Sequence, residues 1–180
     1  MIVNGRKLLT AAPIKNMLPA KCKAHGVSHG LSEAGYDIRI AQEVRFQPAD
    51  CYLEDGEQSS RDVVLFRDTK WPAYHGFAEV PGRFLLASSV DEFQMPNNLV
   101  GYVKDKSTWA RLGLSVFNTV IEPWWKGFLT LELVYHGRDE LVIPAGAGIA
   151  QVLFHQLAEP AMYDGKYQNQ EDRPVEARHD

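Results

Sequence analysis

Apolar and polar residues alternate along most of the chain in short runs, a pattern typical of β-strands. Turn-forming residues such as Gly, Pro, Asn and Asp separate the runs. Only two short helices are expected, one from Asn4 that ends before Pro13 and one between Lys106 and Gly113. Many short strands with few helices indicate one all-β domain over residues 1–180, built as a barrel or a jelly-roll-like sandwich. The pattern predicts strands over 36–46, 63–66, 83–90, 99–103, 114–121, 128–135, 141–143 and 149–156.

The predicted strand at 128–135 carries a carboxylate among apolar residues. Glu132 points away from the face that the leucines and Tyr135 form. Such a glutamate lies either on a solvated outer face or in a pocket, where desolvation raises its pKa and makes it a usable proton carrier. The alternation by itself leaves both interpretations open.

Residues 106–111 combine hydroxyl and cationic side chains at a predicted helix start. Ser107 and Arg111 stand four residues apart, so a helix places them on one face. The first turn of a helix has backbone N–H groups without partners, and Lys106 stands beside them. The segment therefore suits a phosphate or another anion, although an ordinary capped surface turn has the same pattern.

Composition and charge narrow the classes of protein. Hydrophobic residues make up 45% of the 180 residues and charged residues 23%, as in soluble globular proteins. The net charge of -4 argues against a nucleic-acid partner. No apolar run approaches the roughly 18 residues of a membrane span, and the N-terminus has no secretory signal pattern. We expect a cytoplasmic protein without a membrane partner.

Several local patterns favour ordinary structural roles. Cys22 and Cys51 are far apart and fit unpaired thiols, although one disulfide stays open. His25 and His29 lie in a glycine-containing stretch and are expected to be solvated loop residues. Alternation around Asp37 predicts an ion pair with Arg39 on the polar face of a strand.

Five segments stand out by their motifs: KSTWARLG at 106–113, IEPWWKG at 121–127, TLEL at 130–133, GIAQVLF at 148–154 and GKYQNQ at 165–170. Together they resemble the dCTP deaminase family within the dUTPase-like superfamily. SHGLSEAGYDIRI at 28–40 resembles the same family's early strand. The resemblance implies a mainly β, dUTPase-like distorted jelly-roll barrel that forms a homotrimer with active sites between subunits.

The resemblance also implies a reaction, the hydrolytic deamination of dCTP to dUTP and ammonia, which supplies dUTP for dUMP and dTTP synthesis. Glu132 matches the family's general base and acid, whereas Ser107 and Arg111 match the residues that orient the water and fix charge beside it. The implied substrate-binding residues are Lys106, Ser107, Thr108, Trp109, Ala110, Arg111, Thr119, Val120, Thr130, Leu131, Glu132, Gln151, Tyr163, Lys166 and Gln170. Glu122 is expected to reach the sugar hydroxyl.

The polar composition of residues 158–180 predicts a segment that is mobile without ligand. In the resembling family this segment closes over the nucleotide, which is the action of a lid. The zinc-dependent nucleobase deaminases need HxE and PCxxC segments, and neither is present, so no zinc and no protein-bound metal are expected. Mg²⁺ is expected to be bound through the substrate triphosphate.

The chain departs from the family's pattern near the base site. Residues 122–125 replace a glycine-containing DPG-type turn, Val120 replaces the usual alanine or proline, and the loop at 115–121 is shorter than in some branches. Base specificity, and binding of dUTP or dTTP, therefore stay open. The alternatives are a dUTP diphosphatase or bifunctional enzyme, and a non-catalytic sensor of nucleotides.

Overall fold

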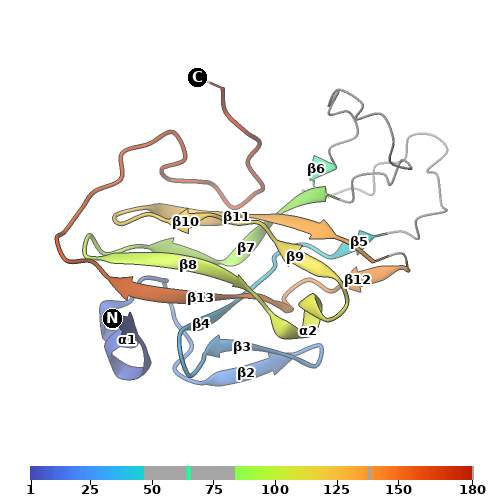
Figure 1. Ribbon diagram of the computed structural model, residues 1–180, viewed down its shortest axis with the longest axis horizontal. Helices are drawn as coiled ribbons and strands as arrows, with labels where there is room; N and C mark the ends of the chain where they lie inside the picture. The colour runs from blue at the N-terminus through green and yellow to red at the C-terminus, as the bar shows by residue number, and fades with distance from the viewer. Residues whose placement is uncertain (47–63, 66–83, 138, 180) are drawn as a thin grey trace.

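The computed structural model describes residues 1–46, 64–65, 84–137 and 139–179 (Figure 1). Strands dominate this part of the chain, so the prediction of a mainly β fold is confirmed. The helices are α1 (Gly5–Ala11) and α2 (Ser107–Ala110). The strands are β1 (Ile2–Val3), β2 (Lys21–Ala24), β3 (Val27–Leu31), β4 (Tyr36–Arg39), β5 (Val44–Phe46), β6 (Val64–Leu65), β7 (Phe84–Gln94), β8 (Leu99–Asp105), β9 (Leu114–Val116), β10 (Val120–Ile121), β11 (Lys126–Tyr135), β12 (Leu141–Ile143) and β13 (Gly148–Gln156).

Most of these strands belong to two antiparallel sheets. The larger has the order β10-β8-β13-β4-β3-β2, and β1 also pairs with β13. The smaller has the order β6-β7-β11-β9, and β12 pairs with β5. Beyond β4 the chain crosses to the smaller sheet, where Ile40 bridges Ser89 and the Ala41 N–H donates to the Ser88 carbonyl at 2.8 Å. The two sheets are thus joined at this edge, as in a flattened barrel.

One apolar core lies between the sheets. Tyr36 and Ile38 of β4 and Phe154 of β13 enter it from the larger sheet, and Leu131 and Leu133 of β11 enter it from the smaller one. Leu131 and Leu133 are fully buried. Burial of each such side chain stabilises the fold by roughly 1.5–3 kcal/mol. Truncation of Leu131 to Ala would therefore cost about 2–5 kcal/mol, because the leucine also fills its cavity.

Two strands predicted as continuous are interrupted, each where a side chain bonds to a backbone. The run at 36–46 forms β4 and β5, and between them the Gln42 side chain accepts from the Ser88 N–H and donates to its hydroxyl, both at 2.8 Å. The run at 114–121 forms β9 and β10, and in the break the Asn118 side chain bonds to β11. Alternation alone does not show such breaks, because the side chain substitutes for the backbone in the ladder.

The polar residues of β3 and β4 differ from expectation. The predicted ion pair between Asp37 and Arg39 is wrong, because Asp37 binds Lys106 at 2.6 Å and Arg39 binds Asp91 at 3.1 Å. The expectation for His29 is also wrong, since it is buried within β3, and this burial lowers the pKa of its imidazole. The error in the ion pair arises because the partners of Asp37 and Arg39 come from elements distant in sequence.

Other expectations near the N-terminus agree with the structure. α1 begins after Asn4, His25 is exposed in the turn between β2 and β3, and Cys22 is a free, exposed thiol. Cys51 lies outside the described residues. Neither described helix has the length and apolar character needed to cross a membrane.

Candidate active site

A pocket of about 570 Å³ lies among β10, β11 and the C-terminal segment, residues 158–179. Six residues expected in the site contribute to its wall: Thr119, Val120, Thr130, Glu132, Tyr163 and Gln170. Glu122 lines it as well. The other lining residues are Phe84, Leu86, Asn118, Ile121, Trp125, Leu129, Tyr167, Val175 and Ala177.

Glu132 is half-buried in this pocket. Its side chain points away from the buried Leu131 and Leu133, as the alternation predicted. Leu86 stands directly opposite it on β7, and cross-strand neighbours have Cβ atoms about 4.5–5.5 Å apart. Burial among such apolar groups raises the pKa of the Glu132 carboxyl. Of the two positions that the alternation left open for Glu132, a solvated face or a pocket, the structure shows the pocket. Its carboxyl is therefore suited to proton transfer.

Asn118 fixes the backbone around Glu132. Its Oδ1 accepts the Glu132 N–H at 3.2 Å, and its Nδ2 donates to the Thr130 carbonyl at 2.6 Å. The Glu132 carbonyl accepts the Phe117 N–H at 2.8 Å. These three bonds hold the loop with Thr119 against β11. They place that loop and the Glu132 carboxyl on the wall of one pocket.

Thr130 connects β11 to the C-terminal segment. Its hydroxyl donates to the Gln170 side-chain oxygen at 3.1 Å and accepts the Val175 N–H at 3.1 Å. The side chain is buried, so both bonds lie in a water-poor environment. Gln170 also forms a parallel bridge with Gly127, and its carbonyl accepts the Phe128 N–H at 3.1 Å.

The turn before β11 provides further bonds to the same segment. The Tyr163 N–H donates to the Pro123 carbonyl at 2.9 Å, and the Trp125 indole donates to the Tyr167 carbonyl at 2.6 Å. The C-terminal segment, red in Figure 1, runs above β10 and β11. It therefore forms one wall of the pocket in this structure, while its mobility without ligand stays a prediction.

The segment 106–111 stands elsewhere on the same chain and contributes nothing to this pocket. Ser107, Thr108, Ala110 and Arg111 are exposed on or beside α2. Trp109 is buried, and its indole N–H donates to the Gly148 carbonyl at 2.6 Å. Within one chain the structure therefore does not bring Ser107 and Arg111 to the pocket of Glu132.

Three other expected residues also stand outside the pocket lining. Gln151 donates from its amide to the Ser32 hydroxyl at 2.8 Å. The Lys166 ammonium donates to the Arg178 carbonyl and lies 5.5 Å from the centre of the Tyr167 ring. Leu131 is in the core, so only its backbone is available to a ligand.

Sequence reasoning missed several residues that form the pocket. Asn118 carried a signal, since an amide at a break between two strand-like runs often bonds to the backbone. Tyr167 belongs to the GKYQNQ segment, and this membership is its signal. Phe84 and Leu86 showed no signal beyond strand periodicity, because their position opposite β11 depends on register.

Two carboxylates line the pocket, Glu122 and Glu132, together with neutral amide and hydroxyl groups. The described part of the chain has no group of three or more His, Cys, Asp or Glu placed to hold a metal ion. This donor set fits an ion whose other ligands are phosphate oxygens and water, as Mg²⁺ prefers.

Comparison with known proteins agrees with the resemblance in sequence. A sequence model described as dCTP deaminase-like matches residues 8–157. A dCTP deaminase of Roseiflexus castenholzii is 38% identical over 151 residues, covering 80% of this chain and 79% of that protein. One of Herpetosiphon aurantiacus is 38% identical over 154 residues, with the same coverage of 80% and 79%. The solved EIAV dUTPase overlays with a TM-score of 0.48 at 15% identity, covering 87% of this chain and 92% of that chain. The extent of the family match, with the identities to the two deaminases, shows that the chain belongs to the dCTP deaminase-like family.

Proposed function

We propose that this protein hydrolyses dCTP to dUTP and ammonia, with Glu132 as the general base and acid. The observation that carries the proposal is the half-buried Glu132 carboxyl, because burial raises the pKa of this group. The pocket that Glu132 lines is large enough for a nucleotide base and sugar. Family membership supports the same reaction, since the deaminases named above act on dCTP by their names.

The reaction requires one proton carrier that acts more than once. Glu132 takes a proton from water as the water oxygen bonds to C4 of cytosine, and the proton passes to N3. A second transfer from the water-derived hydroxyl to the exocyclic amine lets the C4–N bond break. Ammonia leaves, and C4 keeps the oxygen as the carbonyl of uracil. A carboxyl with a raised pKa suits both transfers near neutral pH.

The backbone around Asn118 supports recognition of the base. Thr119 and Val120 line the same pocket as Glu132, and the bonds of Asn118 to β11 hold their loop in place. Thr119 and Val120 read the base edge in this proposal, and Glu122 bonds to the sugar. Tyr163 and Gln170 cover the nucleotide from the C-terminal segment.

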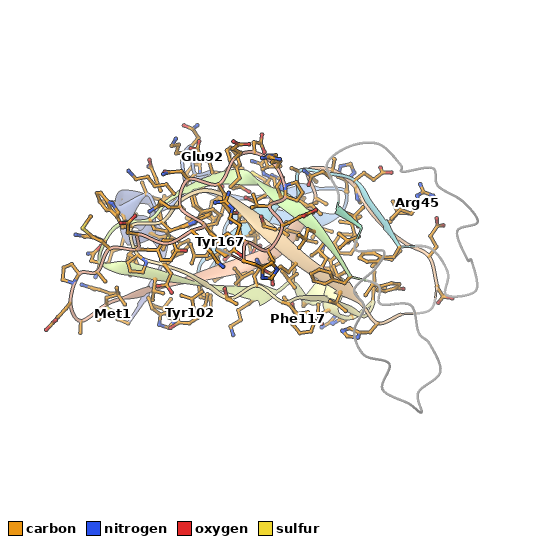
Figure 2. All side chains as sticks on the ribbon, turned by 90° about the horizontal axis from the view of Figure 1, so that it is seen from above. Met1, Arg45, Glu92, Tyr102, Phe117 and Tyr167 are labelled. Atoms are coloured by element: carbon orange, nitrogen blue, oxygen red, sulfur yellow. The ribbon has the colours of Figure 1, made fainter. Side chains whose placement is uncertain are left out.

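A complete site requires Ser107 and Arg111 of a second subunit. Both are exposed and stand outside the pocket of their own chain. An exposed apolar surface supports a homotrimer with sites between subunits. Tyr102 is 39% exposed and Phe117 58% exposed, and Figure 2 shows both along the same side of the molecule. Aromatic side chains are enriched at protein interfaces.

Mg²⁺ enters with the triphosphate in this proposal and keeps most of its water ligands. When bound, the ion offsets the negative charge of the phosphates. The chain's cations would supply the remaining charge, with Arg111 of the second subunit and Lys166 as the residues proposed.

The test is incubation of the purified protein with dCTP and Mg²⁺, with chromatography of nucleotides and assays of ammonia and pyrophosphate. Ammonia and dUTP support the deaminase, and Glu132→Gln should lower the rate by at least about 1000-fold. Exposed Glu159→Gln is the matched control and should keep the wild-type rate. Pyrophosphate with dUMP would instead indicate a bifunctional enzyme, and tight binding without turnover a sensor. Equal rates for Glu132→Gln and wild type would disprove the mechanism.

A further inference from the structure

A buried ion pair connects the start of α2 to the larger sheet. The Lys106 ammonium lies 2.6 Å from Asp37 Oδ2, and the two side chains are only 10% and 3% exposed. The Ser28 hydroxyl donates to the same carboxylate oxygen at 3.1 Å. Lys106 directly precedes Ser107, so this pair lies one residue from the proposed water-orienting hydroxyl.

The path of the Lys106 side chain is narrow. Gly148 of β13 borders it, and a Cβ on this glycine would lie 3.4 Å from Lys106 Cε and 2.0 Å from the Ser28 carbonyl oxygen. The Gly148 carbonyl is also the acceptor for the Trp109 indole at 2.6 Å. α2 is therefore fastened at two points, by Lys106 to β4 and by Trp109 to β13.

This arrangement limits what Lys106 can bind. Its ammonium is desolvated and already neutralised by Asp37 at contact distance. Movement toward a phosphate would leave the Asp37 carboxylate buried without a counter-ion, which is strongly unfavourable. Asp37 Oδ1 has no hydrogen-bond partner among the described residues, so Lys106 is its carboxylate's main compensation.

We propose that Asp37 is a positioning residue for α2, and that Lys106 holds Ser107 and Arg111 in place rather than binding the triphosphate directly. The expected effect on catalysis rests on the proposed deaminase function. The structural role of the Asp37–Lys106 pair does not depend on that function. The role of Asp37 is then to fix the backbone of residues 106–111 in the position where the Ser107 hydroxyl can bond to the attacking water.

The first test needs no substrate. Hydrogen exchange in the Asp37→Asn variant should accelerate at least about tenfold at the α2 amides that bond to the Lys106 and Ser107 carbonyls, those of Trp109, Ala110 and Arg111. Arg39→Met is the matched control, since it breaks the other ion pair of β4, to Asp91, and should leave α2 exchange unchanged. Unchanged exchange in Asp37→Asn would overturn the inference whatever the protein catalyses.

The second test compares kcat and the ratio of kcat/KM for dCTP and dCMP. Asp37→Asn and Lys106→Met should each lower kcat by about 10- to 100-fold and equally, and the double variant should be no worse, because each removes the same pair. Lys106→Arg keeps the charge in a narrow space and should recover part of kcat. Arg39→Met should lower the melting temperature while kcat stays close to wild type. Ser28→Ala, which removes one bond to Asp37, gives a milder loss if the larger changes prevent folding.

A different pattern would reassign Lys106 to the phosphates. Direct contact predicts that Lys106→Met abolishes the preference for dCTP over dCMP while Asp37→Asn keeps it, and that result would overturn the inference. Wild-type protein that releases no ammonia would end the deaminase proposal instead, and hydrogen exchange would then decide the positioning role.

Discussion

The backbone N–H of Glu132 donates to the side chain of Asn118 at 3.2 Å, across two segments that the alternation pattern treats as separate strands. The Asn118 side-chain Nδ2 also donates to the Thr130 carbonyl at 2.6 Å. The Asn118 side chain thus connects Glu132, the proposed general base, to the loop that is proposed to recognise cytosine.

Replacement of Asn118 by Ala should lower kcat by roughly 10- to 100-fold, because the loop and the Glu132 backbone lose their connection. Loss of two hydrogen bonds should also lower the free energy of unfolding by about 1–3 kcal/mol. Asn118→Asp is the control, since it keeps the acceptor for the Glu132 N–H. It should retain more activity than Asn118→Ala, and equal losses would mean that the bond to Glu132 is unimportant.

Gly127 allows the C-terminal segment to pack against β11. Its φ is +128°, and a Cβ there would lie 2.5 Å from the Gln170 nitrogen. Gly127→Ala should therefore displace the segment and raise the KM for dCTP about tenfold, equivalent to about 1.4 kcal/mol of binding. Limited proteolysis of the C-terminal segment should become faster. Gly146→Ala, at a positive φ with nothing within 4 Å, is the control and should change neither result.

Trp124 has a positive φ of 69°, a conformation that glycine adopts without strain. The indole is 39% exposed, and the Lys126 ammonium lies 4.9 Å from its ring centre. Trp124→Gly and Trp124→Ala lose the same ring, but alanine keeps the strain of this φ, whereas glycine relieves it and gains freedom in the unfolded chain. The first effect is the larger, so chemical denaturation should find the glycine variant more stable by about 0.5–1 kcal/mol. A more stable alanine variant would contradict the strain.

Local periodicity predicts most strands of the fold and the side of the strand on which Glu132 lies. The strand at 128–135 was predicted with Glu132 opposite the leucines, because side-chain direction in a strand depends only on position along it. The structure adds an irregularity in the pairing between Phe128 and Thr130, and Leu129 lines the pocket with Glu132. A local pattern does not contain such a shift in register.

Contacts between distant segments were beyond sequence reasoning. Asp37 and Lys106 are 69 residues apart, whereas local alternation predicts a pair between Asp37 and its near neighbour Arg39. The polar composition of the C-terminal segment predicts mobility without ligand, which stays a prediction, but it gives no sign of the backbone bonds from this segment to Pro123 and Lys126. These bonds need the turn before β11 as a template, which composition does not describe.

Burial of the Glu132 carboxyl has a consequence for stability against pH. The pKa is raised in the folded state, so over the interval between the unfolded and the folded pKa the folded protein binds more protons. Stability contributed by this group therefore falls as pH rises through that interval, and the loss persists at higher pH. Glutamine has no charge to desolvate.

Glu132→Gln should accordingly raise the melting temperature at pH 7 and have little effect near pH 4, where the carboxyl is protonated in the folded protein and largely so in the unfolded chain. Scanning calorimetry of both proteins at the two pH values measures the difference. Exposed Glu159→Gln should show no such pH-dependent gain. A Glu132→Gln variant less stable than wild type at pH 7 would mean that the carboxylate is compensated in the folded protein, and would remove the argument that burial prepares it for proton transfer.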